Sequence, residues 1–174
     1  MAPVNSMLST ALSAIEIRNE CPKVFCLSLP EVRRTAVQIL KKAGYKQKGL
    51  SLLLVGDRRM RVLNRRFLNH DWTTDVITFS YGEQQTLADP SVVPLGEIII
   101  SLDTAKKMAV EFGHSPKYEF YFYHCHGILH LAGYDDDTPR KRAAMLKKQG
   151  EILKRIGIAK GKGRAKHLAT TLGR

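Results

Sequence analysis

The stretch "SPKYEFYFYHCHGILHLAG", residues 115–133, has the composition of a buried helix but carries three histidines. Ser115 suits the N-cap, Pro116 the first helical position and Gly133 the end of the helix. Three aspartates, 135–137, follow almost at once. Imidazoles and carboxylates are costly to desolvate unless they are paired or bound to a metal. The stretch is therefore either a solvated helix end or a place where these side chains converge on a ligand.

The helical period separates the histidines. At about 100° per residue, His126 and His130 project from the same side of the helix, and Phe122 continues that row. His124 faces away, and Cys125, offset by one step, suits core packing. Two histidines at i and i+4 are the usual way in which a helix presents two nitrogens to one metal ion. We expect His126 and His130 to be metal ligands and His124 to be a bystander.

The aspartates after the helix have two possible functions. One of them can supply a third metal ligand from the loop, or they can cap the next helix, which begins near Pro139. Asp137 or Thr138 suits that capping position. We expect Asp136 to be the third ligand.

The residue after the first histidine argues against one class of enzyme. Metalloprotease helices carry a glutamate there, which acts as the general base, and here the residue is Gly127. An interior glycine costs a helix about 1 kcal/mol relative to alanine. We interpret Gly127 as permitting another backbone or a substrate to approach closely, and peptidase chemistry is disfavoured.

Strand and helix patterns intermix along the rest of the chain. Alternating or continuous apolar runs predict strands, and amphipathic segments with capping residues predict helices. The expected strands are 13–18, 50–57, 75–81 and 96–101, and the expected helices are 29–44, 58–68, 102–113, 115–133 and 138–157. On the helix at 58–68, Met60, Leu63 and Phe67 have helical spacing. The expected fold is α/β (α+β), with a small mixed sheet of about four strands, about five helices and a metal site at the end of a central helix.

Composition and charge limit the class of protein. The chain has 174 residues and a formal net charge of +12, which favours an anionic partner such as nucleic acid over a merely soluble basic protein. We expect one domain over residues 1–158 and a basic, disordered tail over 159–174, which either grips phosphates or only solubilises the chain. The chain has three cysteines without a C-x-x-C pair, no long apolar run and no convincing signal peptide. We therefore expect a cytoplasmic protein with no membrane contact.

Three linked motifs resemble one known family. "HGILHLAGYDD" at 126–136 closely resembles the H-G-x-L-H-L-x-G-Y-D-H segment of the YbeY family. "LN" at 63–64, Asp71 and "TDVITFSY" at 74–81 look like a second family motif, and "LGEIIIS" at 95–101 resembles a third. In order and spacing the resemblance covers roughly residues 12–157. It implies a bacterial metal-dependent endoribonuclease linked to ribosomal RNA maturation and ribosome quality control.

The chain departs from the family pattern at two positions. Asp136 stands where the family has its third ligand histidine, and a carboxylate can replace that histidine. The carboxylate adds a negative charge to the ligand set. Metal-bound water should therefore be less acidic, and harder metals should be better tolerated. Leu68 stands where the family has an arginine that contacts phosphate. Arg65, on nearly the same helix face, could substitute as a phosphate contact, whereas Arg66 points elsewhere. Leu68 could instead belong to the core.

The expected function is a single-strand-specific, metal-dependent endoribonuclease acting in ribosomal RNA (16S 3′-end) maturation and ribosome quality control. His126, His130 and Asp136 would hold one divalent ion, with zinc expected, and basic residues of 58–66 and the tail would bind the RNA backbone. Metal-bound water or the RNA 2′-hydroxyl would attack phosphorus. The resemblance also implies ribosomal or GTPase protein partners. The alternative is a catalytically weak or inactive protein that retains the metal-site fold and binds RNA or the ribosome; a zinc hydrolase of non-nucleic substrates is disfavoured.

Overall fold

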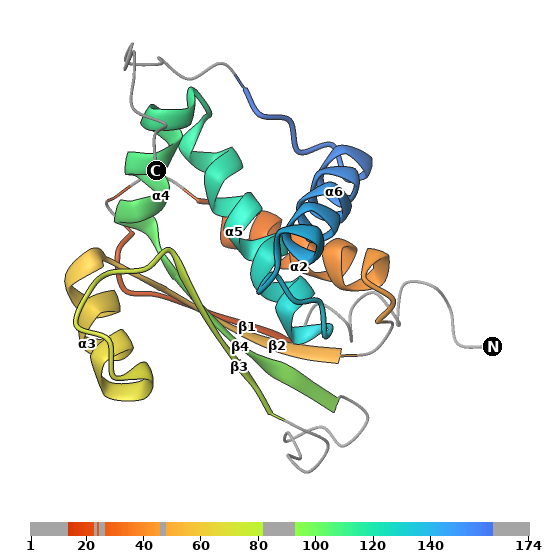
Figure 1. Ribbon diagram of the computed structural model, residues 1–174. Helices are drawn as coiled ribbons and strands as arrows, with labels where there is room; N and C mark the ends of the chain where they lie inside the picture. The colour runs from red at the N-terminus through yellow and green to blue at the C-terminus, as the bar shows by residue number, and fades with distance from the viewer. Residues whose placement is uncertain (1–13, 23, 25–26, 46–47, 82–92, 162–174) are drawn as a thin grey trace.

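The computed structural model describes residues 14–161 except 23, 25–26, 46–47 and 82–92. Within this part of the chain it contains four strands and five helices (Figure 1). They are β1 (Ile15–Asn19), α2 (Leu29–Lys42), β2 (Lys48–Val55), α3 (Asp57–Leu68), β3 (Val76–Ser80), β4 (Val93–Ser101), α4 (Leu102–Phe112), α5 (Pro116–Leu131) and α6 (Pro139–Arg155). The expected fold class is confirmed. None of the described helices is long and apolar enough to cross a membrane. Most of the expected tail, 162–174, lies outside the described residues.

The sheet is mixed, with strand order β1-β2-β4-β3. β1 and β4 both pair with β2 in parallel, and β3 pairs with β4 in the antiparallel sense at one edge. β4 begins at Val93, three residues before the expected start at residue 96, and it includes Pro94. In the structure Pro94 lies opposite Gly49, where the register of β2 shifts, and an irregularity of this kind tolerates a residue without an N–H.

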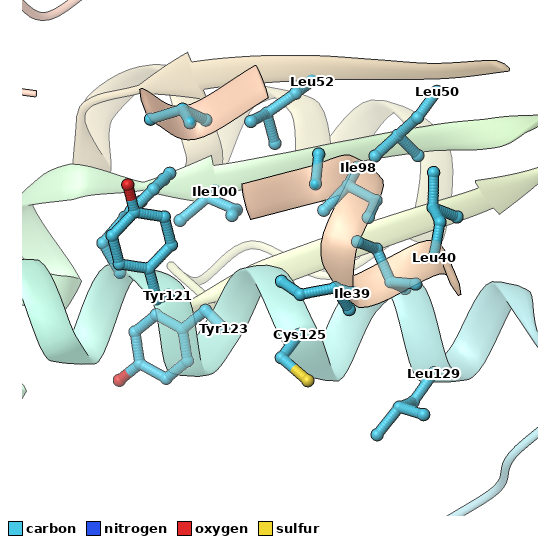
Figure 2. Packing of buried hydrophobic residues seen from close by; sticks show 14 of the residues in the cluster. Ile39, Leu40, Leu50, Leu52, Ile98, Ile100, Tyr121, Tyr123, Cys125 and Leu129 are labelled. Atoms are coloured by element: carbon cyan, nitrogen blue, oxygen red, sulfur yellow. The ribbon is translucent and has the colours of Figure 1, made fainter. Parts of the chain in front are cut away.

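The two faces of the sheet are covered unequally. Successive strand residues point to opposite faces, so Ile98 and Ile100 belong to the large core with α2 and α5, while Ile99 belongs to a smaller cluster with Met60 and Leu63 of α3 (Figures 1 and 2). Phe67, which has the same helical spacing, is 52% exposed, because the small cluster buries only the earlier turns of α3.

Helix capping follows the sequence closely. The hydroxyl of the residue before each of four helices accepts a hydrogen bond from the backbone N–H three residues later, and these residues are Ser28, Ser101, Ser115 and Thr138. Of the two candidates for the last cap, Thr138 is the residue used, and its oxygen lies 3.3 Å from Lys141 N. Asp136 and Asp137 therefore do not cap α6.

The starts of α3 and α4 are joined by two carboxylates. Asp57 accepts hydrogen bonds from the hydroxyls of Ser101 (2.6 Å) and Thr104 (2.7 Å) and pairs with Lys107. Asp103 in turn accepts from the backbone N–H of Asp57 at 2.9 Å. Burial raises the pKa of the Asp57 carboxyl, but the hydrogen bonds from these three side chains outweigh it and leave the net pKa below its ordinary value. Each helix thus anchors the first turn of the other.

At Gly127 helix α5 lies close against the sheet. A β-carbon there would lie 2.8 Å from Cγ2 of Ile98 and 3.2 Å from Cγ2 of Thr78. The groups that approach it are therefore side chains of β4 and β3, not another backbone or a substrate as expected. Ile98 is fully buried and has no room to move.

Gly127→Ala should lower the free energy of unfolding by about 1–3 kcal/mol, because overpacking at Ile98 outweighs the better helix propensity of alanine. Gly150→Ala, within α6, is the matched control. A β-carbon at 150 would meet nothing within 4 Å, so this variant should gain up to about 1 kcal/mol. Urea unfolding followed by circular dichroism measures both. A Gly127→Ala variant at least as stable as wild type would contradict the packing argument.

Candidate metal centre

Three side chains converge at the C-terminal end of α5. His126 and His130 come from the helix, one turn apart, and Asp136 comes from the turn that follows it. The two Nε2 atoms are 3.0 Å apart, and each lies 3.7 Å from an oxygen of the Asp136 carboxylate. Among the residues that the structure describes, no other group of three histidine, cysteine or acidic side chains converges in this way. The structure thus brings together the three residues expected as ligands.

Hydrogen bonds behind the imidazoles determine their tautomers. The Gln149 side chain donates from Nε2 to the Phe122 carbonyl at 2.7 Å, which turns its Oε1 toward Nδ1 of His126 at 3.4 Å. Nδ1 of His130 lies 3.1 Å from the Tyr134 carbonyl, which can only accept. Both Nδ1 atoms are therefore the protonated ones, and both Nε2 atoms carry a lone pair.

This arrangement fits a divalent metal ion. Two lone pairs 3.0 Å apart, beside a carboxylate, repel one another unless a cation or a shared proton lies between them. Ligand atoms bound tetrahedrally to zinc at about 2.0–2.1 Å are about 3.3 Å from each other, close to the distances seen here. Burial, followed by the nearby His130, lowers the pKa of His126 and keeps its imidazole in the neutral form that binds metals.

The two neighbouring aspartates are engaged elsewhere. The Lys141 ammonium lies 2.9 Å from a carboxylate oxygen of Asp135 and 2.9 Å from one of Asp137. Hydrogen bonding to Lys141 lowers the pKa of Asp135 to about 2. Of the three consecutive acids, only Asp136 is turned toward the histidines.

His124 and Cys125 are excluded from the centre, as expected. His124 is fully buried, and neither of its nitrogens finds a hydrogen-bond partner in the described part of the chain. Burial lowers the pKa of His124 to about 3 and raises that of Cys125 to about 12. Both side chains are neutral and belong to the interior.

Comparison with known proteins identifies the family. The model of the family described as "Endoribonuclease YbeY" matches residues 16–157, which include all three converging side chains. The chain belongs to the YbeY family.

Curated relatives named Endoribonuclease YbeY are similar over most of their length. The protein of Pelotomaculum thermopropionicum is 36% identical over 129 residues, which are 73% of this chain and 85% of that protein. The protein of Syntrophus aciditrophicus is 38% identical over 143 residues, covering 80% and 87%. The solution structure of TM1509 from Thermotoga maritima is similar, with a TM-score of 0.53 and 26% identity, covering 82% of this chain and 91% of that one.

The departures from the YbeY pattern lie on separate elements. Leu68, in place of the family arginine, is 44% exposed, so it does not belong to the core. Arg65, the expected substitute, points a guanidinium nitrogen toward Asp71 at 3.8 Å, and Arg66 lies over the Phe67 ring. Within the described residues, no hydrogen bond or ion pair joins these α3 side chains to the histidines.

Gln149 is a site residue that sequence reasoning missed. It lies on α6, fully buried between Met145 and Ile152 on the apolar face of that helix. A polar side chain within an apolar stripe needs a partner, and that signal could have marked Gln149. Its amide positions His126 from behind.

Gln149→Met should weaken the binding of zinc by about ten- to a hundredfold, because His126 then loses the acceptor that orients its ring. Methionine has a similar volume, so the fold should be retained. Competition against a chromophoric chelator measures the affinity, and thermal melting of the metal-stripped proteins is the control. Unchanged zinc affinity would contradict the orienting role.

Proposed function

We propose that this chain is a metal-dependent endoribonuclease acting on single-stranded regions of ribosomal RNA. The observation that carries the proposal is the convergence of the two imidazole Nε2 atoms, 3.0 Å apart, beside the Asp136 carboxylate, an arrangement that a bound cation would stabilise. Membership of the endoribonuclease family supports the reaction, and the net charge of +12 supports a polyanionic substrate.

In this proposal His126, His130 and Asp136 hold one divalent ion, with zinc expected. Such an ion supplies Lewis-acid chemistry at a phosphodiester and makes water more acidic. The chain itself orients the ligands through Gln149 and the Tyr134 carbonyl. Gly127, at the general-base position of metalloprotease helices, has no side chain, so no proton transfer is assigned to that position.

The biological setting is part of the same proposal. We place the activity in the maturation of the 16S ribosomal RNA 3′ end and in ribosome quality control, in the cytoplasm, with ribosomal or GTPase proteins as partners. The proposal also includes the domain organisation, with one nuclease domain over residues 1–158 and a basic tail over residues 159–174. Family membership over residues 16–157 supports this assignment.

A second candidate is a catalytically weak or inactive protein that binds RNA. The exposed Leu68, where the family carries an arginine, is the observation in its favour, because leucine cannot stabilise charge that develops on a phosphate. Activity measurements distinguish the two candidates.

The metal ligands provide the first test. Purified protein should contain one divalent ion and should cleave unstructured ribosomal RNA in a chelator-sensitive manner. His126→Ala and Asp136→Ala should lose the metal and the cleavage together. Asp137→Ala, which removes the adjacent acid paired, among the described residues, only with Lys141, should retain both. Metal analysis beside gel-based cleavage measures this, and full metal occupancy in a His126→Ala/His130→Ala double variant would rule out the assignment.

Restoring the family arginine provides the second test. Leu68→Arg should raise cleavage by about tenfold, less than the hundred- to thousandfold typical of a well-placed charge, because the neighbouring residues have adapted to leucine. The exposure of Leu68 means that the melting temperature should change little. Single-turnover cleavage measures the gain. If both wild type and a folded Leu68→Arg variant fail to cleave, the RNA-binding candidate replaces the nuclease.

A further inference from the structure

The C-terminal end of α3 exposes aromatic side chains to solvent. We call Phe67, His70 and Trp72 the aromatic turn; Phe67 is 52% and Trp72 is 59% exposed. The rings of His70 and Trp72 stack, with centroids 4.3 Å apart and an interplanar angle of 14°. Large aromatic surfaces that remain exposed beside one another mark binding sites more often than structural positions.

Hydrogen bonds and one ion pair hold this turn in place. Asn64 is 1% exposed, and its side chain donates to the Trp72 carbonyl at 2.8 Å. The backbone carbonyl of Asn64 accepts hydrogen bonds from the backbone N–H groups of Asn69 and His70. Asn69 has a left-handed φ of 59°. Arg61 makes a bidentate pair with Asp71 at 2.8 and 3.0 Å. The Trp72 ring is thus presented by a fixed backbone, so little conformational freedom is lost when a ligand binds.

The helix that leads into the turn is strongly basic. It carries five arginines, at 58, 59, 61, 65 and 66, against a single acid, Asp57. Three arginines, two carboxylates, Val62 and Thr73 line a hollow of about 520 Å³; the charged residues are Arg58, Arg61, Arg65, Asp57 and Asp71. Asp71 and Thr73 are the two neighbours of Trp72 in the chain. Guanidinium groups suit phosphate oxygens in charge and in geometry.

The aromatic turn is linked to the metal centre through the edge strand. Phe67 contacts Phe79 of β3 edge to face, with ring centroids 5.3 Å apart. The next residue back along the strand, Thr78, points to the other face and packs against Gly127, beside His126. The aromatic turn and the metal centre therefore flank the same edge strand, one on each face of the sheet.

We propose that the aromatic turn and the α3 arginines form a base-stacking site for single-stranded RNA, which leads the strand over β3 toward the metal centre. Bases stack on Trp72, and the arginine-lined hollow takes the phosphates. Duplex RNA is excluded because its bases are already stacked on one another. The five arginines favour a polyanion over a protein partner. The inference rests on the proposed function for the identity of its ligand.

The test uses Trp72 itself, the only tryptophan of the chain. A short single-stranded uridylate oligonucleotide, added with a chelator present so that it stays intact, should quench the tryptophan emission of wild type. Trp72→Ala should weaken binding about 5- to 150-fold, the range for loss of one stacking aromatic, and Trp72→Phe should restore most of it. The fold should survive both changes, because Asn64 binds the backbone carbonyl of Trp72 rather than its ring.

Phe112→Ala is the matched control, because Phe112 is a 56% exposed aromatic at the end of α4. It should bind the oligonucleotide like wild type, and a duplex of equal length should leave the emission unchanged. Wild-type affinity in Trp72→Ala, or unchanged emission at saturating oligonucleotide, overturns the inference. Emission that changes with protein concentration alone overturns it as well, by indicating a protein contact.

The two proposals can fail separately. Quenching at Trp72 without chelator-sensitive cleavage would refute the nuclease and leave the stacking site standing. Cleavage that is identical in wild type and Trp72→Ala, with no loss of affinity, would refute the stacking site alone.

Discussion

The close contact of α5 with the sheet at Gly127 is the constraint on which the site depends. The missing side chain lets the helix lie directly on Ile98 and Thr78, and α5 is then enclosed by α2, α4 and α6 along most of its length. Beyond its first turn, only the row of Phe122, His126 and His130 keeps partial exposure to solvent, and the two histidines lie at the C-terminal end of that row. The metal centre therefore forms where the most buried helix of the described chain reaches the surface.

The site is assembled from three elements whose contributions differ. Helix α5 supplies two imidazoles at a spacing determined by the helical turn, the turn after it supplies Asp136, and α6 supplies Gln149 as the orienting amide. Lys141 neutralises the two other aspartates, so that they do not add further negative charge to the ligand group. An ion that binds these ligands in the folded chain should stabilise the fold.

Local rules account for what the sequence could predict. The helical period of α5 predicts that His126 and His130 share one face of the helix and that His124 faces away. Serine and threonine at the N-cap positions predict where helices α5 and α6 begin. The features that local rules do not specify depend on contacts between distant segments. The exposure of Phe67 follows from how little of the sheet α3 covers, and Gly127 packs against strands that come some thirty to fifty residues earlier. The role of Gln149 likewise depends on how α6 lies against α5, which helical periodicity does not specify.

The central claim is that two imidazole nitrogens and one carboxylate share a single ion. X-ray absorption spectroscopy at the zinc edge of the zinc-loaded protein measures that ligand shell directly. The account predicts nitrogen and oxygen ligands at about 2.0–2.2 Å, with the outer-ring scattering of two imidazoles and no sulfur. A sulfur ligand at about 2.3 Å, or a shell without imidazole scattering, would contradict it.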